Sequence, residues 1–123
     1  MRKKYTLVIG ASENPERYSY KAIKALLGKG KDVKAFGQRK GEVDGIFFET
    51  AEKPIEDIDT VTLYVGPKNQ PSLYDFILNH IQPRRIIFNP GTENQEFYEL
   101  ARPKGIICEE ACTLVLLATS QYD

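Results

Sequence analysis

The sequence contains few of the residues that bind metals or catalyse reactions, with one histidine and two cysteines among 123 residues. Cys108, Cys112 and His80 supply three side-chain ligands, whereas a structural zinc site usually needs four. The chain alone therefore does not build a zinc site, and we expect no metal. The two cysteines do not form the Cys-x-x-Cys motif of thiol–disulfide enzymes, so we expect reduced thiols.

An excess of charge and long apolar segments are also absent. Lysine plus arginine and aspartate plus glutamate number 17 each, and a chain without a basic excess is not typical of nucleic-acid-binding proteins. The basic start, Met1–Lys4, is followed by a short apolar stretch, Leu7–Ile9, which is shorter than a signal peptide or a membrane-spanning helix requires. We therefore expect a cytoplasmic protein that binds neither nucleic acid nor membrane.

Apolar segments alternate with helical patterns along the chain, which is typical of βαβ units around a parallel sheet. The predicted strands are Tyr5–Ile9, Asp32–Phe36, Thr60–Val65, Arg85–Phe88 and Ile106–Cys108. The predicted helices are Tyr18–Lys29, Asn69–Gln82 and a third that opens at a capping box over Thr92–Gln95. The remaining segments are a short extended piece at Ile46–Phe48 and an apolar tail, Thr113–Ala118, that packs as helix or strand. We expect one Rossmann-like three-layer α/β domain over residues 1–123, with a five-stranded parallel sheet of order 3-2-1-4-5.

The first strand leads through small residues into a helix, and this favours a bound phosphate. Gly10-Ala11-Ser12 precedes the helix that begins near Tyr18, so unpaired backbone N–H groups and the positive end of a helix dipole meet there. In open parallel sheets, ligands bind at the carboxyl ends of the strands where the strand order reverses. The segments expected at that place are Gly10–Ser19, Gly37–Lys40, Val65–Asn69 and Asn89–Asn94.

The ligand is predicted to carry a phosphate on its ribose. The first loop keeps Gly10 but not the later glycines of the Gly-x-Gly-x-x-Gly motif, and the second strand ends in Arg39 and Lys40 instead of an acid that would hold a ribose hydroxyl. NAD therefore fits poorly, whereas NADP and coenzyme A both offer a phosphate to these cations. Solvated loop charges explain Arg39 and Lys40 equally well.

Several residues resemble those of the stand-alone CoA-binding-domain proteins. They are, in the family's order and spacing, Val8-Ile9-Gly10-Ala11-Ser12, Asn14-Pro15, Arg17, Ser19-Tyr20, Gly91-x-x-Asn94, Ala101, Gly105 and Cys112. This family is similar to the N-terminal CoA-binding domain of the succinyl-CoA synthetase alpha subunit and of related acyl-CoA ligases. The chain departs from the family pattern at Gly37-Gln38, where Asn-Pro is common, and at Glu110-Ala111, where Asp-Arg is common.

The resemblance implies a path for the cofactor along the chain. Gly10–Ser12 approach the phosphates, with the helix start beside them, while Phe36–Lys40 lie near the adenosine and Val65–Pro67 lie along the cofactor. The predicted cofactor-binding residues are Gly10, Ala11, Ser12, Asn14, Arg17, Ser19, Tyr20, Phe36, Gly37, Gln38, Arg39, Lys40, Val65, Gly66, Pro67, Asn89, Gly91 and Asn94.

No catalytic residue is predicted. Acyl-CoA ligases of this kind use a phosphorylated histidine in a separate domain, and His80 lies in a helix whose start, not its end, faces the site. The sequence therefore predicts a small CoA- or acyl-CoA-binding protein without catalysis of its own, which is a sensor, a carrier or a module that serves an unidentified protein partner. The alternatives are an NADP- or other nucleotide-binding enzyme or accessory subunit, and a fold used only for protein contacts.

Overall fold

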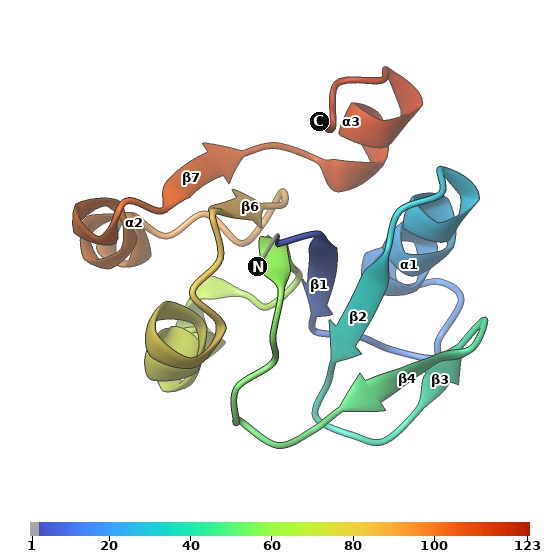
Figure 1. The fold of residues 1–123 in the computed structure, drawn as a ribbon, viewed down its shortest axis with the longest axis horizontal. Coiled ribbons are helices and arrows are strands. Elements are labelled where there is room, and N and C mark those ends of the chain that lie inside the picture. Colours follow the sequence, from blue (N-terminus) through green and yellow to red (C-terminus); the bar gives the residue numbers. More distant parts are fainter. Residues whose placement is uncertain (1–2) are drawn as a thin grey trace.

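The computed structural model describes residues 3–123, and its central element is a seven-stranded sheet of order β3-β4-β2-β1-β5-β6-β7 (Figure 1). The strands are β1 (Tyr5–Ile9), β2 (Val33–Phe36), β3 (Glu42–Val43), β4 (Ile46–Glu49), β5 (Ile58–Leu63), β6 (Arg85–Phe88) and β7 (Ile107–Glu110). The α-helices are α1 (Tyr18–Gly28), α2 (Gln95–Ala101) and α3 (Thr113–Ala118). The shorter helical turns are Pro67–Asn69, Pro71–Leu73, Phe76–Ile81 and Arg102–Lys104. Within residues 3–123, no helix has both the length and the apolarity required to cross a membrane.

The Rossmann-like α/β fold is confirmed, but the predicted five-stranded sheet and its order are wrong. The sequence predicts only an extended piece at Ile46–Phe48, whereas β4 pairs in parallel with β2 and occupies the place beside it. The segment predicted as Thr60–Val65 is β5, and it pairs with β1 instead of β2. The short β3 then adds an antiparallel edge strand, joined to β4 by a turn in which Asp44 and Gly45 both have positive φ.

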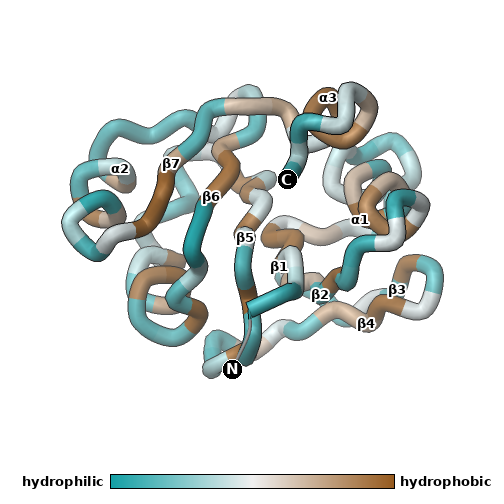
Figure 2. The backbone as a smooth tube through the Cα atoms, turned by 45° about the horizontal axis from the view of Figure 1, so that its top comes forward, coloured by the Kyte–Doolittle hydropathy of each residue, from teal (hydrophilic) through white to brown (hydrophobic). Residues whose placement is uncertain are grey.

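The two faces of the sheet are covered by different helices (Figure 1). Leu7 and Ile9 of β1 pack with α2 and the turns over 67–81 on one face, while Val8 packs with α1 and α3 on the other. This alternation follows from the two-residue period of a strand. Figure 2 shows hydrophobic residues in the central strands and in α3, and hydrophilic residues in most connecting loops.

The predicted helix Asn69–Gln82 is instead a series of short turns. Pro67 and Pro71 each begin a 3₁₀ turn, since a proline lacks the N–H that a continuous helix would use. The chain then widens into a π-helical turn over Phe76–Ile81 and ends at Gln82, which has a left-handed backbone. Leu73, Ile77 and Ile81 are buried as the sequence predicts.

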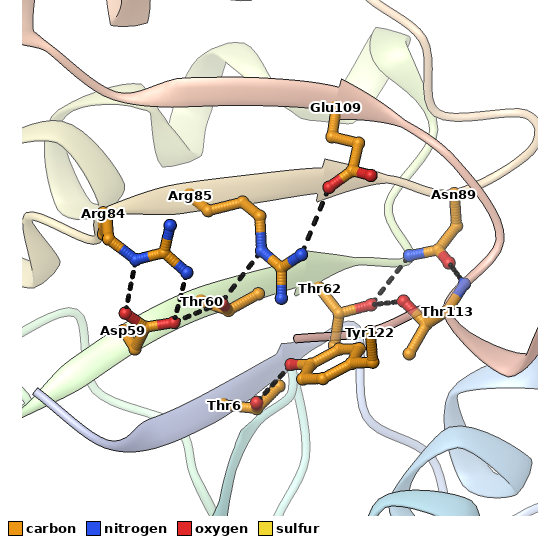
Figure 3. A network of polar contacts seen from close by, with 10 residues as sticks. All are labelled: Thr6, Asp59, Thr60, Thr62, Arg84, Arg85, Asn89, Glu109, Thr113 and Tyr122. Carbon is orange, nitrogen blue, oxygen red and sulfur yellow. Dashed lines mark hydrogen bonds and ion pairs between the residues drawn. The ribbon is translucent and has the colours of Figure 1, made fainter. Parts of the chain in front are cut away.

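Polar side chains run across the sheet face beneath the C-terminal residues (Figure 3). Arg85 is buried, and its Nε donates to Oγ1 of Thr60 at 3.1 Å, while its Nη1 lies 3.2 Å from Oε1 of Glu109. The ring of Tyr122 lies over the Arg85 guanidinium, 4.7 Å from centroid to Cζ, and its hydroxyl contacts Thr6. These contacts fix the residues that follow α3 on the sheet and so hold α3 near the carboxyl ends of the strands.

Candidate functional site

A cavity of about 900 Å³ opens where β1 and β5 lie side by side and the strand order reverses. Its wall combines the loop after β1, the start of α1, the loop after β2 and the loops after β5 and β6. The lining residues are Gly10, Ala11, Ser12, Glu13, Asn14, Glu16, Arg17, Tyr18, Ser19, Gln38, Arg39, Lys40, Phe48, Tyr64, Gly66, Pro90, Gly91 and Thr92.

Most of the residues predicted to bind a cofactor come together in this wall. They are Gly10, Ala11, Ser12, Asn14, Arg17, Ser19, Gln38, Arg39, Lys40, Gly66 and Gly91. The others are not part of the lining, and they are Tyr20, Phe36, Gly37, Val65, Pro67, Asn89 and Asn94.

The loop after β1 is shaped by Gly10. Its φ is +93°, and a Cβ at this position would lie 2.9 Å from the backbone oxygen of Tyr64. The N–H groups of Gly10 and Ala11 both donate to the carbonyl of Phe36 at 3.0 Å. These two amides therefore join β1 to β2, and the prediction that the N–H groups of Gly10 and Ala11 are unpaired is wrong. The only residue that fits both the dihedral angle and the space is glycine.

The start of α1 presents free hydrogen-bond donors to the cavity. Arg17 is the N-cap and makes no side-chain capping bond, and Lys21 is the first helical residue whose N–H reaches a carbonyl. Within residues 3–123, no acceptor is present for the N–H groups of the helical positions 18–20. Asn14 N donates to Ser12 Oγ at 3.1 Å, so the Ser12 hydroxyl proton is available to a ligand. Such donors, together with the positive end of the helix dipole, are of the kind that suits an anion.

Asn89 and Asn94, which the sequence predicts as cofactor-binding residues, form hydrogen bonds within the protein. Asn89 Nδ2 donates to Thr62 Oγ1 at 2.8 Å, and its Oδ1 accepts from Thr113 N at 2.9 Å (Figure 3). Asn94 caps α2 by accepting from Phe97 N at 3.3 Å, so the cap lies two residues after the Thr92 of the predicted capping box. Both side-chain amides are thus engaged in holding loops that border the cavity.

The wall formed by the loops after β5 and β6 is held by Gln70, which sequence reasoning does not find. This side chain is fully buried, and its Nε2 donates to Val65 O at 2.8 Å and to Thr92 O at 2.7 Å. Its Oε1 accepts from Asn94 Nδ2 at 2.8 Å. A lone glutamine between two prolines carries no sequence signal for such a role, because its partners are distant in the chain.

Charges of both signs line the cavity. The cations are Arg17, Arg39 and Lys40, and within the described part of the chain none of them takes part in an ion pair. The anions are Glu13 and Glu16. Arg39 and Lys40 are exposed and lie in the loop after β2, whereas Arg17 lies at the start of α1. Cations without partners favour an anionic ligand.

Two further lining residues, Tyr64 and Phe48, lie outside the predicted ligand segments. The sequence predicts a strand through Val65, whereas β5 ends at Leu63 and leaves Tyr64 in the wall. Its hydroxyl is buried without a hydrogen-bond partner in residues 3–123, and burial raises the pKa of Tyr64 to about 12. Phe48 belongs to β4, which the sequence predicts only as an extended piece.

The remaining candidate groups lie elsewhere. His80 is on the turn Phe76–Ile81, where its Nε2 lies 3.2 Å from Oδ2 of Asp75, as expected for a residue on a helix surface. Cys108 and Cys112 are half-buried free thiols, and burial raises the pKa of the Cys108 thiol. Within residues 3–123, no group of His, Cys, Asp and Glu side chains is arranged to hold a metal ion.

Comparison with known proteins identifies the family. The sequence profile of the CoA binding domain matches residues 4–118. The chain belongs to this CoA-binding-domain family. No curated protein sequence matches it significantly.

Solved structures resemble this CoA-binding domain closely. The crystal structure of an uncharacterized protein shares 42% identity, with a TM-score of 0.92 and coverage of 98% of this chain and 99% of that chain. A hypothetical protein from Pyrococcus horikoshii OT3 shares 28% identity, with a TM-score of 0.83 and coverage of 99% of this chain and 85% of that chain. The fold also recurs in a dinucleotide forming acetyl-coenzyme A synthetase from Ca. Korarchaeum cryptofilum, at 16% identity and a TM-score of 0.71, where 89% of this chain matches 26% of that one.

Proposed function

We propose that this chain binds coenzyme A or an acyl-CoA in the cavity at the carboxyl ends of β1 and β5. The observation that carries the proposal is the arrangement of donors in a member of the CoA-binding-domain family. The open start of α1 lies at one part of the wall, and the unpaired cations Arg39 and Lys40 lie at another. Coenzyme A carries phosphates at two separate places, and both kinds of donor suit them.

The residues of the cavity fit the two phosphate groups in different ways. The N–H groups at the start of α1, the Ser12 hydroxyl and Arg17 would hold the diphosphate, because they combine a helix dipole with directed donors. Arg39 and Lys40 would hold the phosphate on the ribose through charge-assisted hydrogen bonds. Gly66 and Gly91 line the wall without side chains and leave room for the rest of the ligand.

The role proposed for the bound cofactor is recognition, without a reaction carried out by this chain. A nucleophile held by a neighbouring base is the usual sign of covalent catalysis. Among the hydroxyl side chains of the lining, Ser12 accepts from Asn14 N, Thr92 donates to Asn89 O, and the Tyr64 hydroxyl is buried. No histidine of residues 3–123 is among the lining residues of the cavity. We propose that the protein senses, carries or presents CoA to a protein partner. The acetyl-coenzyme A synthetase that shares the fold is several times longer than this chain, so there the fold is one part of a larger enzyme.

A thermal-shift series with CoA, dephospho-CoA, NADP and NAD tests the proposal. A ligand at a hundredfold excess over its Kd adds about 2.7 kcal/mol to the free energy of unfolding, which gives a clear rise in Tm. We expect CoA to stabilise the protein most, dephospho-CoA less and NAD least. Stabilisation by NADP without stabilisation by CoA would replace the proposal with an NADP site, since Arg39 and Lys40 would equally suit its ribose phosphate. A response to none of the four would favour a role in protein contacts.

A further inference from the structure

One side chain fastens the loop after β1 to the β3–β4 hairpin. Oε2 of Glu13 accepts a hydrogen bond from the backbone N–H of Glu42 at 2.9 Å. A Cβ on Gly41 would lie 2.9 Å from both Cγ and Cδ of Glu13, so the glutamate side chain passes directly over this glycine. The same Cβ would lie 2.9 Å from the ring of Phe48. The absence of a side chain at position 41 therefore makes the contact between Glu13 and the hairpin sterically possible.

The loop that carries the cations is anchored at its ends but not in its middle. Gly37 N donates to Glu49 O at 3.0 Å, and Phe48 N donates to Gly41 O at 2.9 Å, so both ends of the loop are fixed on β4. Between them, the side chains of residues 38–40 make no hydrogen bond or ion pair with residues 3–123. When a ligand orders such side chains, the complex loses conformational entropy, and a backbone that is already fixed makes this entropic cost smaller.

Glu13 is a negative charge in a cavity that we propose to bind phosphates. A second cavity of about 610 Å³ is lined by residues of the β3–β4 hairpin, and Glu13, Lys40 and Phe48 line both cavities. Glu13 thus stands directly beside the cation loop, where its charge alone would repel an anionic ligand. Its position is explained by the hydrogen bond that it accepts from Glu42 N, because this bond joins the first loop to the hairpin.

We infer that Glu13 is a positioning residue, which holds the Arg39–Lys40 loop against the cavity so that its cations meet the ribose phosphate of the ligand. This inference rests on the proposed binding of coenzyme A. The charge of Glu13 weakens phosphate binding and its hydrogen bond to Glu42 strengthens it, and the second effect is the larger. The two effects have opposite signs, so substitutions that separate them give opposite results.

The experiment compares the Kd values of CoA and dephospho-CoA by calorimetry for Glu13→Ala and Glu13→Gln. We expect Glu13→Ala to weaken CoA binding roughly threefold to tenfold, because the bond to the hairpin is lost. Dephospho-CoA, which lacks the ribose phosphate, should change much less. Glu13→Gln keeps an acceptor for Glu42 N and removes the charge, so CoA should bind roughly twofold more tightly. If both substitutions tighten CoA binding equally, Glu13 acts through its charge alone and the inference is overturned.

Two matched variants separate position from charge. Gly41→Ala leaves the charge of Glu13 in place, but its Cβ displaces the side chain of Glu13 and presses on the ring of Phe48, so CoA binding should weaken at least as much as in Glu13→Ala. Glu16→Ala removes a charge from the same loop without touching the hairpin, and CoA binding should tighten as in Glu13→Gln. If Gly41→Ala tightens CoA binding and Glu16→Ala weakens it, the inference is contradicted.

A measurement without ligand keeps the inference distinct from the proposed function. Amide hydrogen exchange at Glu42 should be slowed in the wild-type protein and become fast in Glu13→Ala, while Glu13→Gln stays protected. Unchanged protection of Glu42 in Glu13→Ala shows that Glu13 does not hold the hairpin and overturns the inference. If that protection is lost while the wild-type protein fails to bind CoA, Glu13 holds the hairpin but not for a CoA phosphate, so the proposed function fails and this inference fails with it.

Discussion

Asn94 Nδ2 donates a hydrogen bond to Oε1 of Gln70 at 2.8 Å, and this contact ties the start of α2 to the turns that follow β5. Gln70 is fully buried and uses the donors of its amide group for the carbonyls of Val65 and Thr92. One side chain thus satisfies three groups that belong to two loops of the cavity wall. The shape of that wall depends on Gln70 although Gln70 does not line the cavity.

Replacing Gln70 tests this dependence. Gln70→Leu removes the partner of the Val65 and Thr92 carbonyls and of one N–H of the Asn94 amide, and each buried unsatisfied group costs about 1–3 kcal/mol. We expect the free energy of unfolding, measured by denaturant titration, to fall by about 2–4 kcal/mol. Gln95→Leu is the matched control, because Gln95 is exposed and its side chain only meets Glu99 at 3.3 Å. If Gln70→Leu and Gln95→Leu lower the free energy of unfolding equally, the hydrogen bonds of Gln70 do not hold the cavity wall together.

The parts of the site that are local in sequence could be predicted, and the parts that depend on distant partners could not. Gly10–Ser12 and the start of α1 follow one another in the chain, so the strand, loop and helix signals act together. The partners of Asn89 and Asn94 are Thr113 and Gln70, each more than twenty positions away. The sequence places these asparagines at the edge of the sheet where a ligand is expected. It does not show that their amide groups form hydrogen bonds with other residues of the protein.

The order of the sheet could not be predicted for a similar reason. The turn Asp44-Gly45 is of a type that commonly joins two paired strands. However, β3 has two residues and β4 has four, so both strands are too short to display the alternation of apolar and polar residues that identifies a strand. Once β4 takes the place beside β2, β5 is left to pair with β1 on the other side. One short strand, β4, thus decides the strand order, while the helical faces and the cavity edge follow from longer patterns.

Gly10 should tolerate no side chain. Gly10→Ala forces a Cβ to within 2.9 Å of the Tyr64 carbonyl and keeps a φ of +93°, which L residues rarely adopt. We expect the free energy of unfolding to fall by more than about 1 kcal/mol, together with a loss of CoA binding. Gly28→Ala is the control, since nothing lies within 4 Å of its Cβ position and the residue belongs to α1. The free energy of unfolding of Gly28→Ala should rise by up to about 1 kcal/mol. If both variants instead have a lower free energy of unfolding than the wild type, the steric explanation for Gly10 is contradicted.

Arg39 and Lys40 should distinguish CoA from dephospho-CoA. If they hold the ribose phosphate, Arg39→Ala and Lys40→Ala each weaken CoA binding roughly tenfold and leave dephospho-CoA nearly unchanged. Calorimetric titration of both ligands measures the ratio of the two Kd values directly. Lys29→Ala, at the other end of α1, removes an equal charge and should leave that ratio as in the wild type. If the substitutions weaken the binding of CoA and dephospho-CoA by a similar factor, the two cations do not bind the ribose phosphate.

Asp59 should make the stability depend on acidic pH. Hydrogen bonds from Arg84, at 2.7 and 3.1 Å, lower the pKa of Asp59 below its usual value, and a bond from Thr60 acts in the same direction. A carboxyl whose pKa is lower in the folded state stabilises the protein above its unfolded pKa, and this contribution disappears as the pH falls through the folded pKa. Arg84 is half-exposed, so Asp59→Asn should cost only about 0.5–1 kcal/mol at neutral pH.

Denaturation of the wild type and of Asp59→Asn at several pH values measures this contribution. The difference in unfolding free energy should be constant from neutral pH down to about pH 5 and should shrink below about pH 4. In an Arg84→Ala background the same substitution should have a smaller effect, because the main cause of the lowered pKa is gone. A difference that persists unchanged at the lowest pH would contradict the assignment to Arg84.

Tyr64 and Tyr122 should respond oppositely to the loss of their hydroxyl groups. The Tyr64 hydroxyl is buried without a partner in residues 3–123, whereas that of Tyr122 contacts Thr6. Tyr64→Phe should therefore keep or raise the free energy of unfolding at neutral pH, and Tyr122→Phe should lower it by about 1 kcal/mol. Because burial raises the pKa of folded Tyr64 to about 12, the unfolded chain ionises first as the pH rises above about 10.

The wild-type protein should accordingly lose stability between about pH 10 and pH 12 through Tyr64, and Tyr64→Phe should lack this part of the loss. Denaturant titrations of both proteins at neutral and alkaline pH measure the difference. If Tyr64→Phe is instead destabilised by as much as Tyr122→Phe at neutral pH, the Tyr64 hydroxyl has a partner in the folded protein. That partner would then be sought at Thr62 and Thr113, which lie near enough to oppose the rise in its pKa.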